Sequence, residues 1–350
     1  ASMALSAPPS ALNFFLIDFK GGGAFGKLRD LPHVVGYADD LTIGGPLANR
    51  LLVSLRAELD LRKARFKDAA NASDLGEYRL RRRQQASLPD FARLVVVVDE
   101  FAELKEQQPD FVEGLVNVAR IGRSLGVHLV LATQQPAGVV TPQIRDNANL
   151  RVCLRVLDAG TSLDLVRTPV AASFSRRNRG RAVVMLGQDE APIVLQAAYV
   201  SGPPRRMGDA AVPPPRVFEL PWSQVGAAAL EPERAERQDV ETDLVLLVDL
   251  VVQAAGGTDA VRPRRPWLQP LGDFLPLEQL QAVSDAVAVP FAVEDRPGEQ
   301  RQVAIALRLG AGNVGIAGGR SSGRSTTLRT IAAACALGHT PDSLHLHVID

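Results

Sequence analysis

A run of apolar residues at Leu94–Val98, four of them valine, is the clearest structural signal in the chain. Such a run cannot alternate between a buried and a solvated face. It therefore predicts a strand covered on both faces, as in the parallel sheets of α/β proteins. Two carboxylates, Asp99 and Glu100, follow directly. Open α/β sheets bind ligands at the carboxyl ends of their strands, so this pair marks a candidate site.

Apolar runs and helical spacings alternate through the first 200 residues. Leucines between residues 47 and 59 recur at helical spacing, and this helix is expected to run on into the arginine-rich stretch 78–85. A second helix is predicted over residues 112–123. Strands are predicted over residues 12–18, 94–98, 127–133, 150–157 and 181–186. This alternation predicts an α/β fold with a mostly parallel sheet and helices on both faces.

The acidic pair and an amide later in the chain are candidate catalytic residues for nucleotide hydrolysis. In nucleotide hydrolases a strand of this kind delivers an aspartate to Mg²⁺ and a glutamate to the attacking water. Asp99 and Glu100 fit these roles, and Gln134 follows the strand 127–133 where such ATPases place a sensor of the γ-phosphate. The alternatives are a core strand ending in a solvated acidic turn, and a plain strand-end amide.

A second nucleotide-binding signal lies near the end of the chain. The candidate phosphate-binding residues are Gly318, Gly319, Arg320, Ser321, Ser322, Gly323, Arg324, Ser325 and Thr326. They fit the phosphate-loop pattern G-x-x-x-x-G-K-[ST], with arginine in place of lysine. An apolar segment, 313–317, precedes them as a predicted strand, and residues 328–334 follow as a helix.

This context favours a cradle for the phosphates of ATP over a plain Gly/Ser-rich loop. Backbone N–H groups and the helix N-terminus attract phosphate, and the Ser325 hydroxyl would bind Mg²⁺. Arg324 can hold phosphate, but its planar guanidinium is not interchangeable with a lysine that reaches between the β- and γ-oxygens.

The order of the two signals is reversed for a single domain, because the phosphate loop normally precedes the acidic strand. Segments Leu12–Asp18 and Leu344–Asp350 are both predicted strands that end in Ile-Asp, and they lie 332 residues apart. We therefore expect one period of a tandem ATPase array, cut inside a domain at each end, and negligible ATP hydrolysis by these residues alone. The predicted parts are an ATPase core without its own phosphate loop (1–202), a Pro/Arg-rich connector (203–235), a preamble (236–285) and the start of a second core (286–350).

The chain resembles the FtsK/SpoIIIE family of P-loop motor ATPases and, within it, the type VII secretion ATPases (EccC/EssC-like). The segments that carry the resemblance are 18–22, 31–34, 97–104, 122–136, 144–147, 150–156 and 180–182. The resemblance implies RecA-like cores, a homo-hexamer, a membrane anchor upstream and a place on the cytoplasmic side of the bacterial inner membrane. It also implies a motor for protein export, with a DNA translocase as the alternative. In a third interpretation, the second core only binds nucleotide and regulates the first.

Arginines in the first core are candidates to reach a neighbouring subunit's phosphate. Arg145, Arg151 and Arg155 are the residues in question, and the alternative for each is a surface arginine paired with a carboxylate. The denser run Arg79–Arg83 is interpreted as a solvated helix end, with a DNA contact as the alternative, because no aromatic residues interleave for base stacking.

Composition agrees with a multidomain protein that favours neither nucleic acid nor membrane through its overall charge. Lys and Arg total 39, as do Asp and Glu, so the net charge is zero. The two cysteines, Cys153 and Cys335, lie in apolar runs, which predicts buried, reduced thiols and a cytosolic location. No apolar stretch reaches the length of a membrane-spanning helix.

Overall fold

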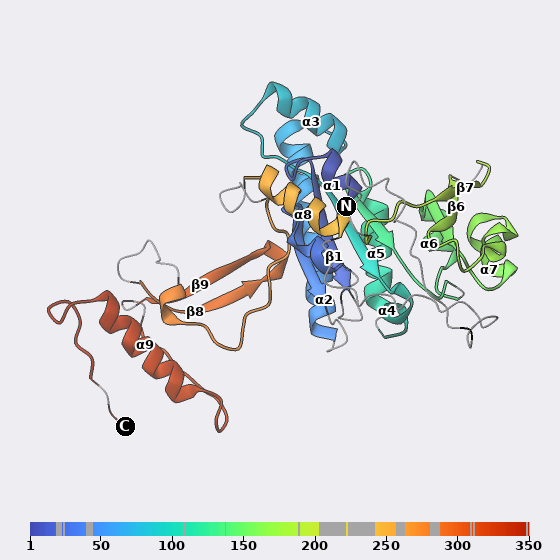
Figure 1. The fold of residues 1–350 in the computed structure, drawn as a ribbon. Helices are drawn as coiled ribbons and strands as arrows, with labels where there is room; N and C mark the ends of the chain where they lie inside the picture. Colours follow the sequence, from blue (N-terminus) through green and yellow to red (C-terminus); the bar gives the residue numbers. More distant parts are fainter. Residues whose placement is uncertain are drawn as a thin grey trace. The chain divides into compact units, whose positions relative to one another are not determined.

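A computed structural model of the chain (Figure 1) separates into two compact units, each built from three stretches of sequence. Unit 1 comprises Ala1–Leu12, Gly22–Val34 and Thr133–Arg262, and unit 2 comprises Asn13–Gly21, Val35–Ala132 and Pro263–Asp350. The structure describes residues 1–18, 23, 25–39, 45–107, 109–136, 138–187, 190–202, 222, 242–256, 263–280, 288–308, 310, 312–347 and 349. The predicted connector 203–235, apart from Trp222, and the motif residues 19–22 lie outside them.

Unit 2 contains a four-stranded sheet in the order β2-β1-β3-β4. Its strands are β1 (Leu12–Asp18), β2 (Val34–Asp39), β3 (Arg93–Asp99) and β4 (Val127–Leu131). Its helices are α2 (Gly45–Ala64), the π-helix η2 (Arg65–Ala69), α3 (Leu75–Gln84), α4 (Phe101–Gln107) and α5 (Pro109–Gly122). The later residues add η6 (Leu277–Gln279), β8 (Ala288–Arg296), η7 (Pro297–Glu299), β9 (Arg301–Arg308) and α9 (Arg324–Gly338). The predicted α/β fold with a parallel sheet is confirmed, since β3 and β4 pair in parallel.

The place of each strand in this sheet explains its sequence. β1 lies inside the sheet and all seven of its residues are buried, which matches its nearly unbroken apolar run. β3 is also internal and is buried from Leu94 to Val96. β4 is an edge strand in which buried and more exposed residues alternate, with His128 and Val130 on the open side. The two internal strands, β1 and β3, therefore have the most continuous apolar sequences.

Three expectations for unit 2 are wrong. The helix from residue 47 does not run on to residue 85: α2 and η2 end at Ala69, and α3 begins anew at Leu75, because the Asp74 side chain accepts a hydrogen bond from the Glu77 N–H and caps it. Residues 313–317 form no strand, and neither do the described residues of 344–350. A strand needs a hydrogen-bonded neighbour, and no described strand pairs with either segment. Residues 313–317 are largely exposed instead.

Unit 1 is built on a separate three-stranded sheet. Its elements are α1 (Ser2–Ser6), η1 (Gly26–Asp30), α6 (Pro142–Asn147), β5 (Leu150–Leu154), α7 (Ala159–Val166), η3 (Pro169–Ser173), β6 (Arg181–Leu186), β7 (Ile193–Gln196) and α8 (Asp243–Ala254). β5, β6 and β7 are antiparallel, a direction that the apolar pattern did not predict, and β5 ends at Leu154 rather than Leu157. One face packs around Cys153, Val183 and Met185. Both cysteines are buried free thiols, as predicted.

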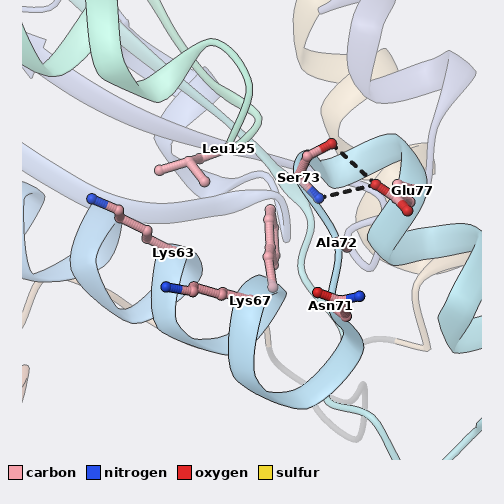
Figure 2. Close-up of a pocket in the computed structure, with 8 residues that line it drawn as sticks. Lys63, Lys67, Asn71, Ala72, Ser73, Glu77 and Leu125 are labelled. Carbon is pink, nitrogen blue, oxygen red and sulfur yellow. Dashed lines mark hydrogen bonds between the residues drawn. The ribbon is translucent and has the colours of Figure 1, made fainter.

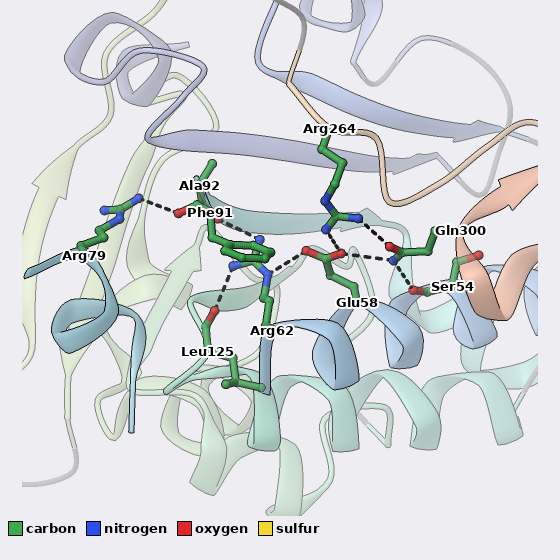
Figure 3. Close-up of polar contacts among 9 residues, drawn as sticks. All are labelled: Ser54, Glu58, Arg62, Arg79, Phe91, Ala92, Leu125, Arg264 and Gln300. Atoms are coloured by element: carbon green, nitrogen blue, oxygen red, sulfur yellow. Dashed lines mark hydrogen bonds and ion pairs between the residues drawn. The ribbon is translucent and has the colours of Figure 1, made fainter. Parts of the chain in front are cut away.

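A buried ion network joins helix α2 to the later residues of unit 2 (Figure 3). The Glu58 carboxylate, 1% exposed, accepts a hydrogen bond from Arg62 at 2.7 Å and pairs with Arg264. Gln300 donates to the same carboxylate at 3.1 Å. Burial alone would raise the pKa of Glu58, but Arg62 and Arg264 outweigh it and hold that pKa below its ordinary value. The carboxylate is therefore ionised inside the protein.

Arg62 connects this network to the sheet. Its other two nitrogens donate to the carbonyl of Leu125 at 2.9 Å and that of Ala92 at 2.8 Å. These carbonyls lie just before β4 and β3, so the guanidinium fixes the amino ends of the two strands. All three of its nitrogens are hydrogen-bonded, which is the condition for keeping a buried cation.

Replacing Glu58 by glutamine should destabilise the protein by about 3 kcal/mol, because it leaves a buried guanidinium without its counter-charge. Denaturant unfolding measures the loss. Glu77→Gln breaks an exposed pair with Arg81 and is the matched control, expected to change stability little. Because the folded-state pKa of Glu58 is lowered, its contribution is present above its ordinary pKa of about 4.5 and is lost as pH falls through the folded-state value. An unchanged midpoint in Glu58→Gln would contradict this.

Candidate functional site

The acidic pair lies where strand β3 ends. Asp99 is the last residue of the strand and half-buried, while Glu100 is 4% exposed. Glu100 has a φ of +51°, a left-handed conformation that is uncommon for residues other than glycine. Backbone strain of this kind persists where the surroundings impose it, and it is frequent at functional sites.

Hydrogen bonds tie this turn to the next strand. The Phe101 N–H donates to the Ala132 carbonyl, and the Ala132 N–H donates to the Val98 carbonyl, both at 2.9 Å. Because β3 and β4 are parallel, their carboxyl ends meet at one edge of the sheet. The backbone that carries Asp99 and Glu100 is therefore fixed at both sides, as a pre-organised site requires.

A further carboxylate ends a strand of the same sheet. Asp18 is the last residue of β1, which neighbours β3, and it is 1% exposed. In the sequence Asp18 marks the repeat and begins one segment of the family resemblance, but it was not predicted as a site residue. Its position at the end of a buried, mostly apolar strand is the same signal that identified Asp99.

Gln134 lies three residues beyond the end of β4 and is exposed. The Thr133 hydroxyl accepts a hydrogen bond from the Gln135 N–H at 3.1 Å and shapes the backbone around it. Gln134 belongs to unit 1, whereas Asp99 and Glu100 belong to unit 2. Its role as a phosphate sensor stays a prediction.

The glycine-rich segment 318–326 forms a tight loop at the start of α9. A Cβ on Gly318 would lie 2.2 Å from Ser322 Oγ, so a larger residue would displace the Ser322 side chain. The Ser322 hydroxyl donates to the Gly319 carbonyl at 2.9 Å, and Gly323 has a φ of +91°. α9 begins at Arg324, so Arg324, Ser325 and Thr326 form its first turn.

This loop fits a phosphate group. Its residues, except the half-buried Gly323, are exposed, and a helix N-terminus adds its dipole. Ser325 provides a hydroxyl and Arg324 a guanidinium in the same turn. Mg²⁺ prefers oxygen ligands and is bound mainly by phosphate, water and one or two side chains. Among the described residues no three His, Cys, Asp or Glu side chains group to hold a metal ion.

The three predicted trans arginines have different surroundings. Arg151 is 8% exposed and donates to the Gly187 carbonyl at 3.2 Å, on β5 inside unit 1. Arg155 donates to the Phe174 carbonyl at 3.0 Å. Arg145 is half-buried on α6. Arg151 and Arg155 thus donate hydrogen bonds to backbone carbonyls within unit 1.

A basic hollow of about 480 Å³ lies at the amino ends of β3 and β4, away from the acidic pair. Sequence reasoning did not identify it. Its lining includes Arg93, Arg120, Arg123 and His128, and also Asp74, which caps α3. Partial desolvation, then Arg93 and Arg123, lower the pKa of His128. Within the described residues neither Arg93 nor Arg123 has a carboxylate within ion-pair distance. Arg123 lies in the segment 122–136 that carries the family resemblance, so the sequence contained a signal that could have identified it as a functional residue.

Searches against known proteins agree with one another. The FtsK/SpoIIIE family model matches residues 1–138. The ESX secretion system protein EccC of Geobacillus thermodenitrificans is 32% identical over 351 residues, covering 100% of this chain and 23% of the relative. The type VII secretion system protein EssC of Staphylococcus aureus is 33% identical over 366 residues, covering 100% of this chain and 24% of the relative.

A solved structure shows the same fold. The cytoplasmic domain of the Thermomonospora curvata type VII secretion ATPase EccC superposes with a TM-score of 0.77 at 30% identity, over 97% of this chain and 37% of that one. The chain therefore spans about a quarter of the length of these relatives. None of its described helices has the length and apolarity to cross a membrane.

Proposed function

Because the chain belongs to the FtsK/SpoIIIE family, we propose that it is part of an ATP-driven motor that exports protein substrates in a type VII-like secretion system. The observation that supports this best is the tandem order. One core contributes the acidic pair Asp99 and Glu100, and the phosphate loop of a second core follows on the same chain. Similarity to secretion ATPases runs over that whole arrangement.

In this proposal each side chain has one task. Glu100, buried and held in a fixed turn, orients the attacking water and accepts its proton. Asp99 and, in the second core, Ser325 would hold Mg²⁺, which when bound neutralises phosphate charge. Gln134 would contact the γ-phosphate. Loop 318–326 would hold the phosphates of the second core's ATP through its backbone N–H groups.

Assembly into a homo-hexamer would let one subunit complete its neighbour's site. Arg123 is suited to this, in addition to Arg145, Arg151 and Arg155, because it is exposed and has no carboxylate partner among the described residues. Arg123 lies just before the amino end of β4, whereas Glu100 follows the carboxyl end of β3. The length of β3, about 20 Å, separates these two ends of the sheet. Arg123 therefore cannot serve the nucleotide at its own acidic pair.

Protein and DNA substrates can be separated by binding. The intact motor, with the membrane anchor expected upstream, should bind a secreted helical peptide at physiological salt, and the peptide should stimulate its ATPase. Strong duplex binding usually needs a basic face that neutralises many phosphates, whereas this chain has no net charge. DNA-stimulated ATPase with steeply salt-dependent binding and no peptide binding would replace secretion by DNA translocation.

The second core is a candidate for a regulatory, non-hydrolysing module because Arg324 replaces the usual lysine. We expect Arg324→Lys in the intact motor to leave ATP affinity similar and to keep or raise hydrolysis at that site, since an ammonium can reach between the β- and γ-oxygens. Nucleotide binding and single-turnover hydrolysis measure both. Arg320→Lys, in the same exposed loop, is the control. A large loss of binding in Arg324→Lys alone would show that the guanidinium itself is required.

A further inference from the structure

Positive charge is concentrated in one stretch of unit 2. Residues 62–93 contain nine Lys and Arg but four Asp and Glu, although the net charge of the whole chain is zero. This stretch includes the end of α2, the π-helix η2 and α3. We refer to residues 62–84 as the basic arm, which is labelled by α3 in Figure 1.

Aromatic packing fixes the arm, and apart from the buried Arg62 and the half-buried Arg79 and Arg82 its cations are exposed. The rings of Phe66 and Tyr78 stack with centroids 4.5 Å apart, and Phe91 packs edge-on against both. These rings are at most 5% exposed. The remaining surface is basic, with exposed side chains at Lys63, Arg65, Lys67, Arg81 and Arg83.

Most of the acids nearby are already engaged. Glu77 accepts hydrogen bonds from Ser73 and pairs with Arg81 at 3.5 Å, and Asp90 pairs with Arg82 at 3.5 Å. Asp74 caps α3. Asp68 is the exposed acid left on η2. Within the described residues, Lys63, Arg65, Lys67 and Arg83 have no carboxylate within ion-pair distance, so the arm keeps an excess of unneutralised cations.

An apolar group and a hollow accompany these cations. Leu80, on α3 between Arg79 and Arg81, is 60% exposed. Between η2 and the start of α3 lies a hollow of about 360 Å³, with Lys63 and Lys67 on one side and Glu77, which is bonded to Ser73, on the other (Figure 2). Cations around a protruding leucine are the pattern of a surface that meets anionic lipid.

We propose that the basic arm is a docking surface for an anionic phospholipid bilayer. Its cations contact lipid phosphates, and Leu80 enters the boundary between headgroups and acyl chains. A single-stranded nucleic acid fits less well, because the aromatic rings that could stack on bases are buried. Duplex nucleic acid would use the cations but would gain nothing from Leu80.

The test is co-sedimentation of the chain with vesicles of phosphatidylcholine alone and of phosphatidylcholine mixed with phosphatidylglycerol. We expect binding to the mixed vesicles only. Lys67→Gln with Arg83→Gln removes two cations and should weaken binding about 25-fold, at about fivefold for each cation near an anionic surface. Leu80→Ser should weaken it by up to about tenfold without a change of charge.

Arg176→Gln with Arg177→Gln is the matched control, because both side chains are exposed in unit 1 and the charge change is the same. This control should bind the mixed vesicles as the parent chain does, and thermal unfolding of each variant confirms that it is folded. Absence of binding to the mixed vesicles would overturn the proposal, and so would equal losses in control and arm variants. Loss on cation removal with no effect of Leu80→Ser, together with tight duplex DNA binding, would assign the arm to a nucleic-acid backbone instead.

Discussion

In the intact motor, Glu100→Gln should abolish ATP hydrolysis at the first site while ATP still binds there. The amide keeps the size of the side chain but cannot accept the proton of the attacking water. Loss of a general base lowers the rate about 10²- to 10⁴-fold. Asp99 remains to hold Mg²⁺, so affinity for ATP should change little. Steady-state turnover and binding of a fluorescent ATP analogue separate the two effects.

A control on the adjoining helix sharpens this result. Glu106 is exposed on α4, and Glu106→Gln removes the same charge a short distance from the site. It should retain normal turnover. If Glu100→Gln also hydrolysed ATP normally, the first core could not be a motor, whatever its family.

The sequence predicts a strand best where both of its faces are buried. The bounds of β1 follow from the pattern alone, because all seven residues of Leu12–Asp18 are buried and five of them are apolar. The antiparallel pairing of β5 with β6 is not predictable in this way. Alternation and apolarity identify a strand, but they carry no information on the direction of its neighbour.

Isolated segments show the other limit. Residues 313–317 have the composition of a strand and yet remain exposed without pairing. Strand propensity depends on a partner that satisfies the backbone and covers the side chains. The loop that follows is local and could be predicted, because the fit of Gly318 against Ser322 needs only residues within one turn.

The candidate site residues also differ in how far they can be predicted from local sequence. Asp99 and Glu100 are encoded together in one strand and turn, so the sequence predicts them. The basic hollow is not local: Arg93 begins β3, Arg120 lies on α5, and His128 belongs to β4. Three separate elements meet there, and no spacing along the chain shows that they do.

Arg123, which lines that hollow, gives the second prediction with a large expected effect. If Arg123 completes a neighbouring subunit's site, Arg123→Gln should lower turnover of the assembled motor about 10³- to 10⁵-fold, the range of trans arginines in nucleotide hydrolases. ATP affinity should fall far less, because the guanidinium stabilises charge that develops in the transition state. Arg120→Gln, which removes a neighbouring cation of the same hollow, is the control expected to retain turnover.

Mixing two inactive variants distinguishes action in trans from a structural defect. Arg123→Gln subunits keep Glu100, and Glu100→Gln subunits keep Arg123. In a mixed assembly some sites receive Glu100 from one subunit and Arg123 from the next, so ATPase activity should reappear at intermediate ratios and vanish at either end. A folding defect or an effect within one subunit gives no such maximum. If no ATPase activity reappeared at any mixing ratio, Arg123 would be excluded from the trans role, and Arg145, Arg151 and Arg155 would remain the candidates.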